Sequence, residues 1–295
     1  MTSARMRIAW AFNPFDDNRR LQKNAVALLD AVRGGDGPLE VVYVASPAEA
    51  QLATAFDVPA AERFSAHPKR LIEAALRELG VARATVTVLP QRSASLTAGV
   101  RALAAHLAQR KPALTLIASH ARQGLPRLML GSFAESFVHV SKTDLLVFNA
   151  HSRVRAPQAL LFAHDLSAAA DQGLRAAIGY AKRWRCALHV IHVPDPAYGF
   201  TLSGREAQVE AFRRTVREQV AGVEATLKRA GLSGSVVIDP AWNPVAELIL
   251  KRRQRVRADM LVVVAKTGRL ASLVGGSVTR QLLRAAPLPV LVIKT

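Results

Sequence analysis

The sequence predicts an α/β protein of two repeated units, each a five-stranded, mostly parallel sheet with helices on both faces. Short apolar runs alternate with longer segments of helical periodicity along the whole chain, which is typical of parallel strands joined by helical crossovers. Residues 113–150 also align with residues 261–295. Gly131-Ser132 then lies opposite Gly276-Ser277, and an offset of 145 residues holds without a gap to the last strand. This internal repeat predicts two copies of one fold.

We expect the first unit to occupy residues 1–152. Apolar runs predict its five strands at residues 7–12, 39–45, 84–89, 113–119 and 145–148. Asn18 is placed to cap the first helix. The second helical region, at residues 46–80, is expected to break at Pro59 and Pro68, because proline removes a backbone donor and clashes with the preceding turn. A third helix is predicted at residues 96–108.

The second unit is expected at residues 157–295, after a polar and basic linker, HSRVRAP, at residues 151–157. Its strands are predicted at residues 158–164, 186–193, 235–238, 260–265 and 290–293. Its helices are predicted at residues 168–184, 206–230, 243–257 and 277–286. The order of elements therefore repeats that of the first unit.

A basic loop that contains glycines indicates an anion site in the second unit. It runs from Lys266 to Gly276, after a strand that ends at Ala265, and Ser277 opens the next helix. In this arrangement the loop amides and the positive end of the helix dipole face the same point. The residues alone leave a purely structural alternative open, in which Gly268 is a turn glycine and Ser277 an ordinary N-cap.

On these motifs the chain resembles the universal stress protein family in its tandem two-domain form, over nearly all 295 residues. The resemblance implies a Rossmann-like fold of the adenine nucleotide alpha hydrolase type and a nucleotide-responsive binding or signalling role in the stress response. Nucleotide-binding members carry an aspartate at the end of the first strand and G-x2-G-x9-G-[ST] after the fourth. In the family the last strands of two domains commonly pair. Leu145–Phe148 is therefore expected beside Val290–Ile293 in an intrachain pseudo-dimer, which hides two strand edges.

The resemblance places a site for ATP or a related adenine nucleotide, with or without Mg²⁺, in the second unit. The residues that it implies for this site are Ala163, Asp165, Val193, Ala265, Gly268, Gly276, Ser277 and Val278. Asp165 stands in the aspartate position, although it is equally placed to cap the following helix, a task that Ser167 is also placed to perform. Ala265 stands where the first glycine is expected, and seven residues instead of nine separate Gly268 from Gly276.

The first unit departs further from the family pattern. Asn13 replaces the aspartate, and the segment from Ala118 to Ala121 lacks both loop glycines. Alanine loses the freedom for positive φ and places a methyl group where phosphate oxygens would approach. Asn13, Gly131 and Ser132 are therefore only weaker equivalents, and this unit is expected to hold ATP less well or to bind another ligand.

The formal net charge of +18 favours anionic partners such as nucleotides, nucleic acid or an anionic membrane surface. Most of it comes from arginines spread along helices, without a helix-turn-helix, zinc-finger or aromatic RNA-binding motif. Solvated basic helix faces are therefore the favoured interpretation, and nucleic acid is disfavoured. No apolar run is long enough for a membrane span, and residues 8–12 are too short for a signal sequence. Cys186 is the only cysteine, and the expected location is the cytoplasm.

No catalytic set emerges from the sequence. The eight histidines show no metal-ligand spacing, and His120 and His164, both at predicted strand ends, are the best of a weak group. The G-x-S-x-G, Walker A and G-x-G-x-x-G patterns are missing. We therefore expect no metal site, and no enzyme activity beyond weak ATP hydrolysis at most.

Other functions stay open at this point. One is a stress protein of the same fold that does not bind ATP but another small anion or a protein partner. The shortened loop and the alanines at positions 118, 121 and 265 favour it. Another is an enzyme of nucleotide hydrolysis or transfer, and a homodimer of the whole chain is also left open.

Overall fold

The computed structural model describes residues 5–16, 18–34, 37–45, 62–91, 93, 95–119, 132–194, 206–239, 244–265 and 277–295. Its strands form one ten-stranded sheet in the order β3-β2-β1-β4-β5-β10-β9-β6-β7-β8. The strands are β1 (Ile8–Ala11), β2 (Leu39–Ala45), β3 (Ala84–Pro90), β4 (Leu114–Ala118), β5 (Leu145–Phe148), β6 (Ala159–Ala163), β7 (Ala187–His192), β8 (Val236–Ile238), β9 (Met260–Ala265) and β10 (Val290–Lys294).

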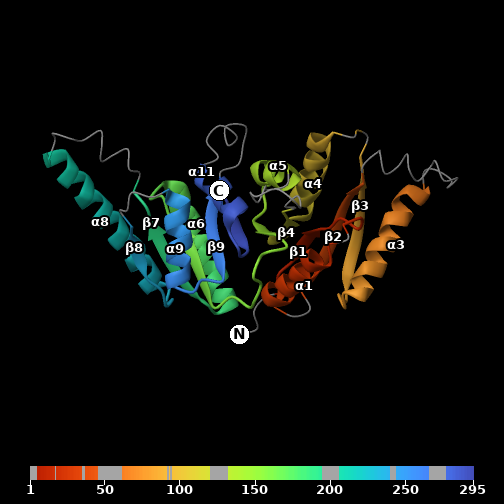
Figure 1. Cartoon of the computed structure of the whole chain (residues 1–295), viewed down its shortest axis with the longest axis horizontal. Helices are drawn as coiled ribbons and strands as arrows, with labels where there is room; N and C mark the ends of the chain where they lie inside the picture. Colours follow the sequence, from red (N-terminus) through yellow and green to blue (C-terminus); the bar gives the residue numbers. More distant parts are fainter. Residues whose placement is uncertain are drawn as a thin grey trace.

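Two halves of equal topology meet in the middle of this sheet. Within each half all strand pairs are parallel. The halves join through β5 and β10, which pair antiparallel with Leu146 opposite Leu291. Figure 1 shows the halves as two arms on either side of this junction. The expected pairing of the two last strands is therefore confirmed, and the two five-stranded sheets are halves of one larger sheet.

The helices cover both faces of the sheet, and corresponding helices of the two halves lie on the same face. They are α1 (Arg19–Arg33), α3 (Glu62–Glu78), α4 (Leu96–Arg110), α5 (Ser132–Val140), α6 (Ala168–Trp184), α8 (Glu206–Arg229), α9 (Val245–Arg255) and α11 (Ser277–Ala285). Helices α1, α3, α6 and α8 contribute to one apolar core, and α4, α5, α9 and α11 to the other. Alternate strand residues supply the two cores, as the two-residue period of a strand requires: Trp10 lies in the first and Ala9 in the second.

The helices confirm one local prediction and contradict another. The Asn18 side chain accepts a hydrogen bond from the Leu21 amide at 3.1 Å, so the predicted cap of α1 is confirmed. The predicted break at Pro68 is wrong, because α3 runs through it. Ile72 and Leu76 of this helix are buried against the sheet, and this packing outweighs a local cost of about 3 kcal/mol for an internal proline. Pro59 lies outside the described residues.

A partly buried carboxylate ties the second half to the first beside the β5–β10 pair. Asp144 precedes β5, and its two oxygens accept from the Lys294 amide at 2.8 Å and from the Tyr180 hydroxyl at 2.9 Å. The same hydroxyl also lies 2.9 Å from the carbonyl oxygen of Ala113. Burial raises the pKa of Asp144, although these contacts counteract it in part. Burial also lowers the pKa of Lys294 to about 8.

We expect Tyr180→Phe to lower the free energy of unfolding by about 1–3 kcal/mol, because the partly buried Asp144 carboxylate loses a hydrogen-bond donor. Urea denaturation at pH 7 measures this loss. The control is the same substitution in an Asp144→Asn background, where the charge that needs the donor has been removed. If Tyr180→Phe costs the same in both backgrounds, this contact does not couple the two halves.

Candidate functional site

Each half of the sheet contains a topological switch point. In the second half β6 lies between β7 and β9, and in the first half β1 lies between β2 and β4. From β6 the chain continues to β7, whereas from the adjacent β9 it continues to β10 on the opposite side, and β1 and β4 behave in the same way. These opposite directions leave a crevice outside the carboxyl ends of the two adjacent strands. Ligands of open α/β sheets bind in such crevices. The molecule therefore offers two candidate sites, one between β6 and β9 and one between β1 and β4.

The structure brings together the described residues predicted for the second site. Ala163 ends β6, Ala265 ends β9 and Val193 directly follows β7, and β6 pairs with both neighbours. Asp165 is exposed two residues beyond the end of β6. Val278 lies in the first turn of α11 and is partly buried.

The predicted glycine loops fall outside the part of the chain that the structure describes. Gly268 and Gly276 lie there, as do Gly131 and His120. Ser277 begins α11 and Ser132 begins α5, and their side chains are not described. The phosphate loop of the second half therefore stays a prediction from the sequence.

The turn after β6 is held by its own side chains. Ser167 caps α6, since its hydroxyl accepts from the Ala170 amide at 3.2 Å. Asp165 Oδ1 instead accepts from the Ser167 amide at 3.0 Å. Leu166 between them has a φ of +60°, a left-handed conformation that is sterically costly for leucine. This turn keeps the Asp165 carboxylate exposed at the switch point, and the capping task goes to Ser167.

A buried histidine supports this strained turn. His164 is 3% exposed, and its Nδ1 accepts a hydrogen bond from the Leu166 amide at 3.0 Å. The proton of the neutral ring is therefore on Nε2, which lies 3.3 Å from Asp171 Oδ1. The carbonyl oxygen of His164 lies 2.9 Å from His192 Nδ1, the donor in this contact. Burial lowers the pKa of His164, and Asp171 and Asp165 raise it in part.

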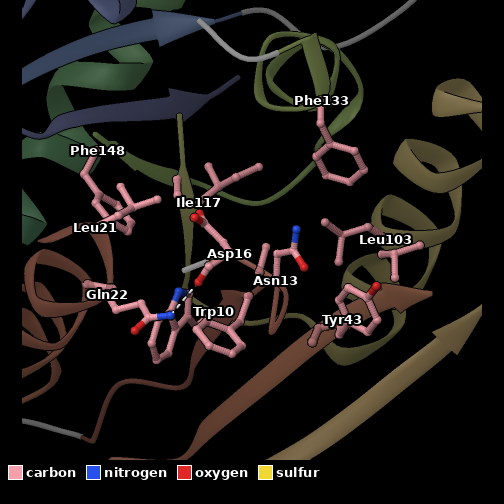
Figure 2. A pocket seen from close by; sticks show the side chains of 16 residues that line it. Trp10, Asn13, Asp16, Leu21, Gln22, Tyr43, Leu103, Ile117, Phe133 and Phe148 are labelled. Atoms are coloured by element: carbon pink, nitrogen blue, oxygen red, sulfur yellow. Dashed lines mark hydrogen bonds between the residues drawn. The ribbon is translucent and has the colours of Figure 1, made fainter. Parts of the chain in front are cut away.

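A cavity lies at the switch point of the first half, between β1 and β4. Its volume is about 260 Å³, and it opens beside the carboxyl ends of β1, β2 and β4. Figure 2 shows Asn13 among its lining side chains, together with Asp16, Tyr43 and Phe133. Asn13 was predicted from the sequence as a weaker site residue, but the cavity was not predicted. The sequence feature that could have indicated it is the aromatic pair Trp10 and Phe12, followed by Tyr43 on the next strand.

The two switch points correspond residue by residue but differ in polarity. Ala11 pairs with Val42 in the first half, as Ala163 pairs with Ile191 in the second. This register equates Phe12 with His164, Asn13 with Asp165 and Tyr43 with His192. The first site is therefore aromatic where the second carries ionisable groups.

These features define a duplicated, Rossmann-like α/β protein with a candidate site at each switch point. The chain belongs to the universal stress protein family, because the model of that family matches it twice, at residues 6–149 and 157–294. No curated protein matches the sequence.

Solved structures show the same fold over nearly the whole chain. A universal stress protein from Archaeoglobus fulgidus DSM 4304 is 18% identical, with a TM-score of 0.64, and 97% of this chain and 98% of that chain are covered. A putative universal stress protein from Pseudomonas aeruginosa UCBPP-PA14 is 15% identical, with a TM-score of 0.61 and coverages of 99% and 94%. A protein of unknown function from Pseudomonas aeruginosa PAO1 is 16% identical, with a TM-score of 0.60 and the same coverages.

The described residues contain neither a membrane-spanning helix nor a cluster of metal ligands. None of the helices found there is both long and apolar enough to cross a membrane. No group of three or more metal-ligating side chains was found in the same ranges.

We expect His164→Asn to reduce the decrease in the free energy of unfolding that occurs at mildly acidic pH. Because the pKa of His164 is lowered in the folded protein, the unfolded chain binds more protons below about pH 6.5, and stability falls as the pH drops. One such group contributes a slope of up to about 1.4 kcal/mol per pH unit. The asparagine oxygen can still accept from Leu166, so stability at pH 7.5 should change by less than about 1 kcal/mol.

Urea denaturation between pH 5 and 7.5 measures this slope. His139 and His189 also have lowered pKa values, so part of the slope remains. His151→Asn, on the exposed linker residue, is the matched control. An unchanged slope in His164→Asn would show that this ring is not the titrating group.

Proposed function

We propose that the second half binds an adenine nucleotide at the switch point between β6 and β9, and that the protein acts as a nucleotide-responsive stress protein. The observation that carries the proposal is the exposed Asp165 carboxylate, which the turn after β6 holds at the carboxyl end of the sheet. Membership of the universal stress protein family and the matching first-strand aspartate support it.

Each proposed contact uses a group whose position suits its chemistry. The second oxygen of Asp165 can accept a hydrogen bond from a ribose hydroxyl or from the adenine amino group. Main-chain groups at Val193 would face the base at the end of β7. The phosphates would lie at the N-terminus of α11, near Val278, where backbone amides and the helix dipole favour negative charge. The loop from Lys266 to Gly276 would complete this cradle.

Helix α11 offers a physical route from the nucleotide to the other half of the molecule. Its first turn faces the proposed phosphates, whereas Arg284 near its end donates to Glu135 of α5 at 2.9 Å. Arg280 lies 3.3 Å from the same carboxylate. A small movement of α11 on nucleotide binding would therefore change a contact between the halves. We propose that a partner protein recognises this change.

A second candidate is a site for a smaller anion in the same place. The spacing of seven residues between Gly268 and Gly276 favours it, because a shorter loop surrounds fewer phosphate oxygens. Inorganic phosphate then binds at least as tightly as ATP, and the base contributes nothing.

We expect the chain to bind ATP with Mg²⁺ in isothermal titration calorimetry, and Asp165→Ala to weaken binding roughly tenfold or more, about 1.4 kcal/mol. Asp30→Ala is the control, since it removes an exposed carboxylate of α1 in the other half. Silence at millimolar ATP, or equal weakening by both substitutions, contradicts the proposed site. A parallel titration with inorganic phosphate separates the two candidates.

A further inference from the structure

We propose that the cavity of the first half is a binding site for a small, uncharged aromatic compound of one or two fused rings. The proposal concerns a different site and a different ligand class from the nucleotide site, and it stands without it. It rests on the walls of the cavity, its charge and its size.

The walls are built mainly from aromatic and aliphatic side chains. Trp10 and Phe12 pack edge to face, with ring centroids 4.7 Å apart. Tyr43 lines the cavity from β2, and Phe15, which is not itself a lining residue, lies edge-on to Tyr43 with a centroid distance of 5.9 Å. Figure 2 shows the ring of Phe133 reaching from α5 toward the cavity, on the side opposite Trp10. Rings that line a concave site in this way offer edge and face contacts to another flat ring.

The charge of the lining disfavours an anion. Of the sixteen described residues that line the cavity, none is lysine, arginine or histidine, and one carries a carboxylate. That residue is Asp16, whose Oδ1 already accepts from the Asn18 amide at 3.0 Å. Against these described residues, a phosphate or carboxylate would lose its hydration without gaining a cation, and it would meet a like charge.

One polar group is placed to orient a ligand. Asn13 Oδ1 accepts from the Phe15 amide at 3.0 Å. Asn13 is exposed, and Figure 2 shows its side chain between Asp16 and Tyr43. The side-chain nitrogen can therefore donate to one oxygen on the edge of an aromatic ring, such as a phenolic hydroxyl group.

The volume limits the ligand further. About 260 Å³ lies just below the range of roughly 300–1,000 Å³ that is usual for small-molecule sites. One or two fused rings fill such a space, whereas a nucleotide with its phosphates is too large for it. The same position in the second half carries His164, Asp165 and His192, so the two sites differ in the kind of ligand that they suit.

The proposal is tested with 2-naphthol and its anionic counterpart 2-naphthoate as probes, by isothermal titration calorimetry of the full chain at pH 7.5. We expect 2-naphthol to bind with a Kd on the order of 0.1 mM, and 2-naphthoate at least about tenfold more weakly. No binding of 2-naphthol up to its solubility, or tighter binding of 2-naphthoate, overturns the proposal.

A pair of matched variants locates the probe. Ala11 lines the cavity at the end of β1, and Ala163 is its counterpart at the end of β6. Ala11→Leu should weaken 2-naphthol binding at least about tenfold by filling the cavity, whereas Ala163→Leu should leave it within about twofold. The reverse result would place the probe in the second half and overturn the proposal.

A third variant tests the charge argument without filling the cavity. Asp16→Asn keeps a side-chain oxygen for the Asn18 amide, so the turn is retained. It should raise the affinity for 2-naphthoate several-fold and leave that for 2-naphthol almost unchanged. An unchanged ratio between the two probes contradicts the role of Asp16. ATP titrations of the Ala11→Leu variant keep the two proposals apart, because loss of naphthol binding with ATP binding intact concerns this cavity alone.

Discussion

The hydrogen bonds between β5 and β10 constrain the rest of the structure, because they turn two half-sheets into one. Unpaired, each of these strands would present a row of free backbone groups at an edge of its half. Their pairing also continues the apolar core on each face from one half into the other. Asp144 reinforces the junction with a side chain that accepts from both β10 and α6. The position of α11 against α5 follows from this arrangement.

Much of the fold could be predicted because a parallel strand covered on both faces is apolar throughout. The runs at 145–148 and 260–265 have the bounds of β5 and β9. Pairing of the last strands came from the family resemblance, since apolar runs carry no information about which edges meet. The error at Pro68 has the opposite cause: a local rule was applied where the packing of Ile72 and Leu76 decides.

The candidate sites were less accessible to sequence reasoning. Asp165 could be placed at a strand end by its motif, but the support that His164 gives to the turn depends on a ring orientation and a tautomer. The first-half cavity depends on how side chains from four strands and three helices leave space between them, which no spacing reveals. What the sequence did contain was a contrast at equivalent positions, Phe12 against His164 and Tyr43 against His192.

The linker between the halves has a consequence for how such a molecule can evolve. In a dimer of identical chains every substitution appears in both subunits, so a change that improves one pocket alters the other as well. Here Asn149 at the end of one half and Ala159 at the start of the next belong to the same chain. Selection can therefore act on each half separately while the shared interface stays intact. Duplication followed by fusion thus permits a division of labour that symmetry would forbid.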